Sequence, residues 1–191
     1  MSDDDASKGG RDSHLIEQII RSEPVYRGRL LDVRCDTIKL PDGHVTHREH
    51  IVHPGAVMII PFLPDGRLLM ERQFRYPMSE VMLEFPAGKL DEGEDPLECA
   101  RRELLEETGY VAQHWEYVLY FYPVVSYSNE RIYIYVARDL THEGGGKLDH
   151  GEFLEVLDLT PQDAFARLQS GEIRDGKTLL GLLLMRERGL I

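Results

Sequence analysis

The sequence predicts an α/β domain, because runs typical of β-strands alternate with segments that carry helix signals. Two Pro-Asp-Gly turns, Pro41-Asp42-Gly43 and Pro64-Asp65-Gly66, separate extended runs in the N-terminal half. The first helix opens with an acidic N-cap residue, Asp95, followed by proline, and it closes before Gly109. A chain of 191 residues with 42% hydrophobic composition can bury one full core, so one compact unit is expected.

The expected strands are apolar or alternating runs that lie between turn residues. In the clearest of them, isoleucine and valine alternate with Tyr133 and Tyr135, which is the period of a half-buried strand. The two Pro-Asp-Gly turns are each expected to close a hairpin. Within an extended region at residues 22–53 and beyond it, strands are predicted at residues 31–40, 45–52, 56–63, 67–75, 81–85, 117–122, 131–137 and 153–157.

Three helices are predicted. The first has Asp95 as its N-cap, and at 100° per residue Leu97, Ala100 and Leu104 fall within about 60° of each other, which marks the side to be buried. The second begins at Thr160 and stops at Ser170-Gly171, and the third covers roughly residues 177–188 with a leucine-rich face.

Composition excludes several classes of partner. Lys and Arg number 22 against 34 Asp and Glu, a net charge of -12, so a nucleic-acid-binding face is not expected. Cys35 and Cys99 have no CxxC spacing, so neither a zinc site nor a disulfide framework is indicated. The N-terminus is acidic and no run reaches the ~18 apolar residues of a membrane span, so we expect a cytoplasmic protein with no membrane partner.

Three glutamates gather on one flank of the first helix. Glu106 projects about 60° from Glu103, and Glu107 lies beside Glu103, so like charges face each other at i, i+3 and i+4. Water can screen such a group as an ordinary solvated face, or a cation can neutralise it. The strand at residues 81–85 runs through a glycine turn into an acidic loop directly before this helix, so several acidic elements converge on one place.

Mg²⁺ is the cation that fits a cluster of glutamates without histidine or cysteine. It prefers oxygen ligands, keeps several waters, and is usually held by a few carboxylates together with substrate phosphates. The sequence therefore predicts Mg²⁺, with Mn²⁺ as its substitute, and a small substrate that carries phosphate.

The spacing around this helix resembles the Nudix box of a known hydrolase family. Every fixed position of the box is matched, and the one departure is Tyr110, at a packing position where the family usually has an aliphatic residue. The matching residues are Gly88, then Glu94 after five intervening residues, then Arg102-Glu103-Leu104 after seven intervening residues, and, after single-residue gaps, Glu106-Glu107 and Gly109.

The resemblance implies a Nudix-type α/β/α sandwich, in which helices flank a mixed, partly antiparallel sheet. It also implies that Glu103 and Glu107 are the principal metal ligands. Glu106 would be a further ligand or the base, and the carbonyl of Ala87 an additional oxygen donor.

The rest of the box receives supporting roles from the same resemblance. Arg102, counted with the catalytic residues, would pair with Glu94 and so hold the loop against the helix. Gly88 and Gly109 would be structural.

Outside the box, the chain resembles the ADP-ribose pyrophosphatase branch of the family over about residues 22–157. This similarity implies hydrolysis of ADP-ribose to AMP and ribose 5-phosphate. The motifs that carry it are His53-Pro54-Gly55-Ala56-Val57, Arg72-Gln73-Phe74-Arg75-Tyr76 and Leu83-Glu84-Phe85-Pro86-Ala87-Gly88.

In that branch an N-terminal strand region builds a homodimer, and each subunit lends residues to its partner's site. The segment Glu23-Pro24-Val25-Tyr26-Arg27-Gly28 resembles this region. The expected organisation is a flexible tail at residues 1–13, dimerisation strands with an antiparallel sheet at residues 14–53, and a Nudix domain at residues 54–191.

Four residues match positions that contact substrate in the branch: Tyr26, Arg48, Arg75 and Glu130. Tyr26 would stack on the nucleobase, while a guanidinium can fork onto phosphate oxygens. Packing of Tyr26 at the dimer interface, or a surface ion pair for either arginine, is the alternative.

Hydrolysis also needs a base that activates water, and the family often places it on a loop far from the box. The run Gly144-Gly145-Gly146 marks such a loop, and Glu152 best matches the glutamate that serves as base in this branch. The alternative is that Glu152 and Glu155 are solvated charges at a strand end.

One position departs from the branch: Val125 stands where a proline is common. That position shapes the pocket around the second moiety of the substrate, so GDP-mannose or another nucleotide sugar stays open. A noncatalytic nucleotide-sugar sensor is a third hypothesis, which the intact box disfavours.

Overall fold

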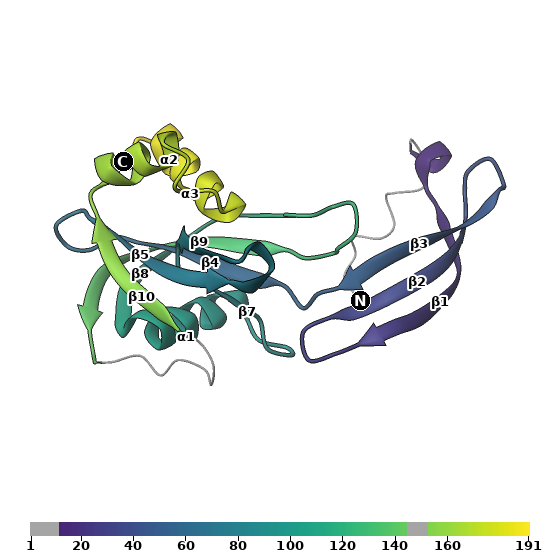
Figure 1. The fold of residues 1–191 in the computed structure, drawn as a ribbon, viewed down its shortest axis with the longest axis horizontal. Coiled ribbons are helices and arrows are strands. Elements are labelled where there is room, and N and C mark those ends of the chain that lie inside the picture. Colours follow the sequence, from purple (N-terminus) through teal and green to yellow (C-terminus); the bar gives the residue numbers. More distant parts are fainter. Residues whose placement is uncertain (1–11, 145–152) are drawn as a thin grey trace. The chain divides into compact units, whose positions relative to one another are not determined.

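The computed structural model describes residues 12–144 and 153–191, which form two units (Figure 1). The first unit contains the chain up to His53 together with Val124–Asn129. The second contains Pro54–Pro123 and Glu130–Ile191. In the described part of the chain, no helix combines the length and apolar character needed to span a membrane.

The N-terminal unit is an antiparallel sheet in the order β1-β2-β3. Gly43 adopts φ 93° in the turn between β2 and β3, so the first predicted hairpin is confirmed. The segment Val124–Asn129 lies along β3, where Ile51 N donates to Tyr127 O at 2.8 Å. The elements of this unit are η2 (Ser13–Leu15), β1 (Gln18–Arg27), β2 (Asp32–Lys39) and β3 (Val45–Val52).

The second unit contains a four-stranded sheet in the order β7-β4-β9-β8 and a three-stranded antiparallel sheet in the order β10-β5-β6. Strands β4 and β9 are parallel and their other neighbours antiparallel, so the predicted mixed sheet is confirmed. The elements are β4 (Ala56–Pro61), β5 (Leu68–Arg75), η3 (Tyr76–Met78), β6 (Glu80–Glu84), β7 (Ala87–Lys89), α1 (Pro96–Thr108), β8 (Tyr110–Phe121), β9 (Ile132–His142), β10 (Leu154–Leu159), α2 (Pro161–Gln169) and α3 (Gly176–Glu187).

Helices cover both faces of the sheets in the second unit. Strand β4 is buried on both sides: Met58 and Ile60 join the core beneath α2 and α3, whereas Val57 and Ile59 join the core beneath α1. Figure 1 shows α1 on one side of the strands and α2 and α3 on the other. The predicted α/β/α sandwich is therefore confirmed.

Helix α1 has the predicted ends. The side chain of Asp95 accepts hydrogen bonds from two backbone N–H groups of the first turn, at 2.9 and 3.4 Å, and Gly109 closes the helix at φ 74°. Ala100 and Leu104 are fully buried, whereas Leu97 is only half-buried, so the buried stripe lies slightly to one side of the predicted one.

The second predicted hairpin is wrong. The turn at Pro64-Asp65-Gly66 is present, but β4 and β5 pair only through one bridge, Phe62 with Leu68, and then enter different sheets. The reason is that β4 takes β9 as its parallel partner, and Phe62 N donates to Ala137 O at 2.8 Å. A local turn signal does not reveal this long-range competition.

Two further strand features differ from the predictions. Strand β8 begins at Tyr110 and β9 extends to His142, so both are longer than the alternating runs that predicted them. Strand β7 has only three residues, too few for any periodicity, yet it places Gly88 opposite Val57 of β4.

A matched pair of leucines on α1 tests its packing. Leu104 is 0% exposed and its neighbour Leu105 is 38% exposed. We expect Leu104→Ala to lower the free energy of unfolding by about 2–5 kcal/mol, because it leaves a cavity in the core. Leu105→Ala should cost under about 1 kcal/mol. Urea unfolding of both variants measures the difference, and equal losses would contradict the burial described.

Candidate active site

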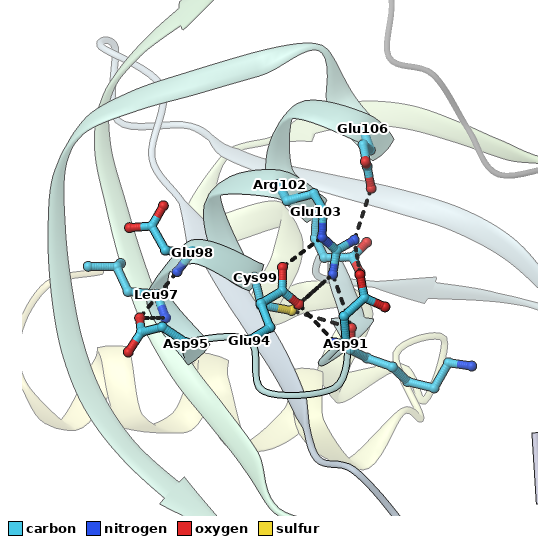
Figure 2. Close-up of polar contacts among 10 residues, drawn as sticks. Asp91, Glu94, Asp95, Leu97, Glu98, Cys99, Arg102, Glu103 and Glu106 are labelled. Carbon is cyan, nitrogen blue, oxygen red and sulfur yellow. Dashed lines mark hydrogen bonds and ion pairs between the residues drawn. The ribbon is translucent and has the colours of Figure 1, made fainter.

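Arg102 lies at the centre of the carboxylate cluster, as Figure 2 shows. Its Nε and Nη2 donate to the two carboxylate oxygens of Glu94, both at 2.9 Å. Its Nη1 donates to Glu103 at 2.8 Å and to Glu106 at 3.0 Å. A further hydrogen bond, from Nη2 to the carbonyl of Lys89 at 3.1 Å, ties the guanidinium to the start of the loop. One side chain of α1 therefore joins the loop to two of the three predicted glutamates.

Glu94 closes the loop that precedes α1. Its carboxylate accepts from Asp91 N at 2.9 Å, and Glu94 N donates to Asp91 O at 3.1 Å. The hydrogen bonds from Arg102 lower the pKa of Glu94 to about 2, against the opposing effect of burial. The pKa of Arg102 is raised in turn, chiefly by its hydrogen bonds to Glu94. Both groups stay charged throughout the neutral pH range.

Gly88 makes room for the carboxylate of Glu103. A Cβ built on Gly88 would lie 1.9 Å from Glu103 Cδ, so any larger residue would push this carboxylate away from the strand. The antiparallel pairing of β7 with β4 fixes the backbone of Gly88 opposite Val57. The glycine of the box therefore lets α1 approach the sheet closely enough for Glu103 to lie over β7.

Glu107 also faces β7. It is buried, and its Oε2 accepts from Ala87 N at 3.1 Å. Glu103 and Glu107 are thus held against the short strand, while Glu106 is more open to solvent. In the described ranges 12–144 and 153–191, no three carboxylate, imidazole or thiol groups form a metal cage on their own.

The cluster carries an excess of negative charge. Three carboxylates, those of Glu94, Glu103 and Glu106, bind the guanidinium of Arg102, and the carboxylate of Glu107 accepts from Ala87 N of β7, so these five charged groups sum to 1 − 4 = −3. All of their ligating atoms are oxygens. This donor set and this charge suit a hard divalent cation that also takes water or phosphate oxygens.

Cys99 lies next to the cluster, and its thiol is unreactive. It is fully buried, and its Sγ donates to the carbonyl of Lys89 at 3.4 Å. Burial is the main reason that its pKa is raised, so the thiol stays protonated. Both cysteines are free thiols.

A second polar cluster is built around Glu84, the last residue of β6. Arg75 forks onto Glu84, with Nε to Oε1 at 2.7 Å and Nη2 to Oε2 at 2.8 Å, and Lys177 of α3 contacts the same carboxylate. Burial would raise the pKa of Glu84, but the hydrogen bonds from Arg75 and the charge of Lys177 outweigh it, so the pKa is lowered. The hydrogen bond to Glu84 is the main reason that the pKa of Arg75 is raised.

Sequence reasoning missed the roles of Glu84 and Lys177. A signal was present, because Glu84 stands inside an otherwise apolar strand run and a buried charge must be paired. Lys177 lies 93 residues away, and no local pattern identifies it as the partner.

The remaining predicted site residues lie in different parts of the chain. Tyr26 and Arg48 belong to the N-terminal unit, where Tyr26 is exposed and Arg48 pairs with Glu17 at 2.5 and 3.1 Å. Arg75 and Glu130 belong to the second unit, and Glu130 lies two residues before the start of β9. Glu152 lies outside the described residues.

The Glu94–Arg102 pair makes stability depend on pH. The pKa of Glu94 is about 2 in the folded chain against an ordinary value of 4.5, so its contribution is complete above pH 4.5 and is lost as pH falls toward 2. We expect the natural chain to exceed Glu94→Gln in urea resistance at pH 6, and this difference to shrink progressively below pH 4.5. A difference that is unchanged between pH 6 and pH 3 would contradict the assignment.

Two family models match the chain. The one described as NUDIX domain covers residues 52–180, and the one described as nucleoside diphosphate sugar hydrolase N-terminal domain covers residues 17–51. A solved structure described as an ADP compounds hydrolase superposes with a TM-score of 0.80 at 28% identity, covering 90% of this chain and 92% of that one.

Characterised relatives have several names. An ADP-ribose pyrophosphatase of Bacillus subtilis is 37% identical over 86% of this chain and 89% of its own length. A methanol dehydrogenase activator of Bacillus methanolicus is 36% identical over 87% and 90%. A GDP-mannose pyrophosphatase of Pectobacterium atrosepticum is 34% identical over 66% and 69%. With the box built as described and the family model spanning residues 52–180, this chain belongs to the Nudix hydrolase family.

Proposed function

We propose that the protein hydrolyses the diphosphate of ADP-ribose, with Mg²⁺, to AMP and ribose 5-phosphate. The observation that carries this proposal is the oxygen-only cluster on β7, where Glu103 lies over Gly88 and Glu107 accepts from Ala87 N. Similarity to the Bacillus subtilis ADP-ribose pyrophosphatase and to the solved ADP compounds hydrolase supports the substrate class.

Glu103, Glu107 and the carbonyl of Ala87 would hold the metal ion, with Glu106 as a further ligand. Their oxygens are the donors that Mg²⁺ prefers, and the charge of −3 on the cluster favours a divalent cation, with Mn²⁺ as the substitute. When bound, the ion neutralises the diphosphate and lowers the pKa of a water.

The chain's own residues orient the reactants. Arg102 fixes Glu103 and Glu106 against the loop, so these carboxylates are placed before substrate arrives. We assign the base to Glu152, with Glu106 as the alternative. The base takes a proton from water, the water oxygen attacks one phosphorus, and the bridging P–O bond breaks to release the two monophosphates.

GDP-mannose is the second candidate substrate. Val125, which stands where the ADP-ribose branch commonly has proline, is 80% exposed in the segment Val124–Asn129. This departure from the ADP-ribose branch and the presence of GDP-mannose pyrophosphatases among the relatives support the alternative.

A sensor without catalysis is the third candidate. One relative is named a methanol dehydrogenase activator, and this regulatory name is the observation that favours a sensor. The complete set of box carboxylates in this chain favours turnover instead, because a sensor has no need for them.

A second copy of the chain is the proposed partner of the N-terminal unit. All ten residues of β1 are exposed, including Ile19, Ile20 and Val25, and among the unit's described residues up to His53 only Asp36 and Ile38 are buried. A three-stranded sheet of this kind needs an apolar surface to pack against.

We also place this small-molecule enzyme in the cytoplasm, without nucleic-acid or membrane partners.

The substrate is tested by phosphate release after coupled phosphatase digestion, with Mg²⁺, across ADP-ribose, GDP-mannose, ADP-glucose, NADH and diadenosine polyphosphates. We expect the highest kcat/KM with ADP-ribose, and a loss of roughly 100-fold or more in kcat for Glu103→Gln, because a principal metal ligand is lost. The control is Glu98→Gln, which removes an exposed carboxylate of the same helix that pairs with Arg101.

Three outcomes of this assay would change the proposal. Full Mg²⁺-dependent turnover by Glu103→Gln would overturn the metal scheme. A preference for GDP-mannose would make the Val125 departure the mark of a rebuilt pocket. Absence of turnover with every compound would favour the sensor.

The dimer is tested by light scattering coupled to size-exclusion chromatography. We expect the natural chain to have twice the mass of one copy, and Val25→Asp to shift it toward one copy, because a buried unpaired charge on β1 disfavours the interface. Arg21→Asp, on an exposed charged position of the same strand, should have the smaller effect. A natural chain with the mass of one copy at micromolar concentration would contradict the proposal.

A further inference from the structure

Arg75 does not pair with the carboxylate that stands directly opposite it on the neighbouring strand. In the antiparallel register of β5 with β6, Arg75 stands opposite Glu80, and Glu80 instead pairs with Arg174. Arg75 reaches along the same face of the sheet to Glu84, which stands opposite Glu71. Its side chain must be extended to do so, at a cost in rotamer entropy. The contact carries the guanidinium toward the end of β6, three residues before Ala87.

The fork between Arg75 and Glu84 uses only one edge of the guanidinium. Nε and Nη2 donate to Glu84 at 2.7 and 2.8 Å, so Nη1 and the outer hydrogen of Nη2 form an edge that points away from that carboxylate. The side chain of Glu84 is 2% exposed and that of Arg75 is 37% exposed. The edge formed by Nε and Nη2, here called the inner edge, is therefore buried with Glu84. The edge formed by Nη1 and the second hydrogen of Nη2, here called the outer edge, belongs to a side chain that reaches solvent.

Glu84 is itself held from the other face of the fold. Lys177, in the first turn of α3, contacts its Oε2, and the next residue, Thr178, accepts a hydrogen bond from Phe85 N at 3.0 Å. The N-cap residue Asp175 fixes this turn by accepting from Thr178 N at 3.0 Å and from its Oγ1 at 2.7 Å. Glu84 therefore has a fixed position from which it can direct Arg75.

The other arginine of the candidate site, Arg102, has its donors engaged already. Its guanidinium binds Glu94, Glu103, Glu106 and the Lys89 carbonyl, so it is committed to holding the loop and the metal-ligand candidates. Arg75 differs because its outer edge has the planar pair of donors that suits phosphate oxygens.

We propose that Glu84 is a positioning residue, which aims the outer edge of Arg75 at the diphosphate of the substrate while Lys177 holds Glu84 in place. The inference deepens the proposed function and rests on it for the identity of the substrate. Glu84 itself touches neither substrate nor the reacting atoms. Its removal therefore acts through Arg75, and the two residues behave as one unit.

The test is a double-mutant cycle read by ADP binding, with Mg²⁺, in isothermal titration calorimetry, together with kcat and KM for ADP-ribose. We expect Arg75→Ala and Glu84→Gln each to weaken ADP binding by about tenfold or more, and the double variant to be no weaker than Arg75→Ala alone. KM should rise in Glu84→Gln while kcat stays within about threefold, because the loss is one of binding.

Two further variants complete the design. Arg75→Lys keeps the charge but loses the fork, so it should bind ADP nearly as weakly as Arg75→Ala, and it is read in place of Glu84→Gln if that variant does not fold. Glu155→Gln is the matched control, because it breaks the exposed Arg72–Glu155 pair on the opposite face of β5. It should leave ADP binding unchanged.

The possible results separate this inference from the proposed function. Each of four results would overturn the inference. Two concern single variants: Glu84→Gln binds ADP with unchanged affinity although its melting temperature is lowered, or Arg75→Lys binds ADP with unchanged affinity. The other two are additive losses of ADP affinity in the double variant and no ADP binding by the natural chain. A natural chain that binds ADP through Glu84 and Arg75 but fails to hydrolyse ADP-ribose would support the inference and refute the proposed substrate.

Discussion

The site depends on one ion-pair network, in which the guanidinium of Arg102 binds the loop glutamate and two helix glutamates at once. Without this contact, three carboxylates at i, i+3 and i+4 would repel one another and the acidic loop before the helix. Arg102 instead ties Glu94, Glu103 and Glu106 to a single centre (Figure 2). The remaining negative charge makes the cluster receptive to a divalent cation.

The connection between β6 and β7 is fixed in position, because helices on both faces of the sheets contact it. From one face, α1 presents Glu107 to Ala87 N at 3.1 Å. From the other, α3 presents Thr178 to Phe85 N at 3.0 Å. The few residues that carry Gly88 are therefore fixed on both sides, which a catalytic constellation needs if its geometry is to be set before substrate binds.

Features with a local cause were predictable from the sequence. Asp95 at the N-cap and Gly109 in the left-handed conformation at the C-cap define the ends of α1 through contacts within the helix itself. Strand β3 likewise runs from Val45 to Val52, as its turn and pattern indicated. The box spacing likewise placed Glu103 beside Glu107, because helix geometry alone sets that relation. Features that depend on long-range choices were not predictable: the partner of β4 is β9, and the partner of Glu84 comes from α3.

The central claim is that Gly88 and α1 together create a divalent-cation site, and Mn²⁺ binding followed by electron paramagnetic resonance tests it without relying on turnover. In Gly88→Ala, the new Cβ would displace the carboxylate of Glu103, whereas Gly176→Ala adds a Cβ that meets nothing within 4 Å. We predict that Gly88→Ala weakens Mn²⁺ binding by about tenfold or more while Gly176→Ala leaves it unchanged. Equal Mn²⁺ affinity in the natural chain and Gly88→Ala would contradict this account of the site.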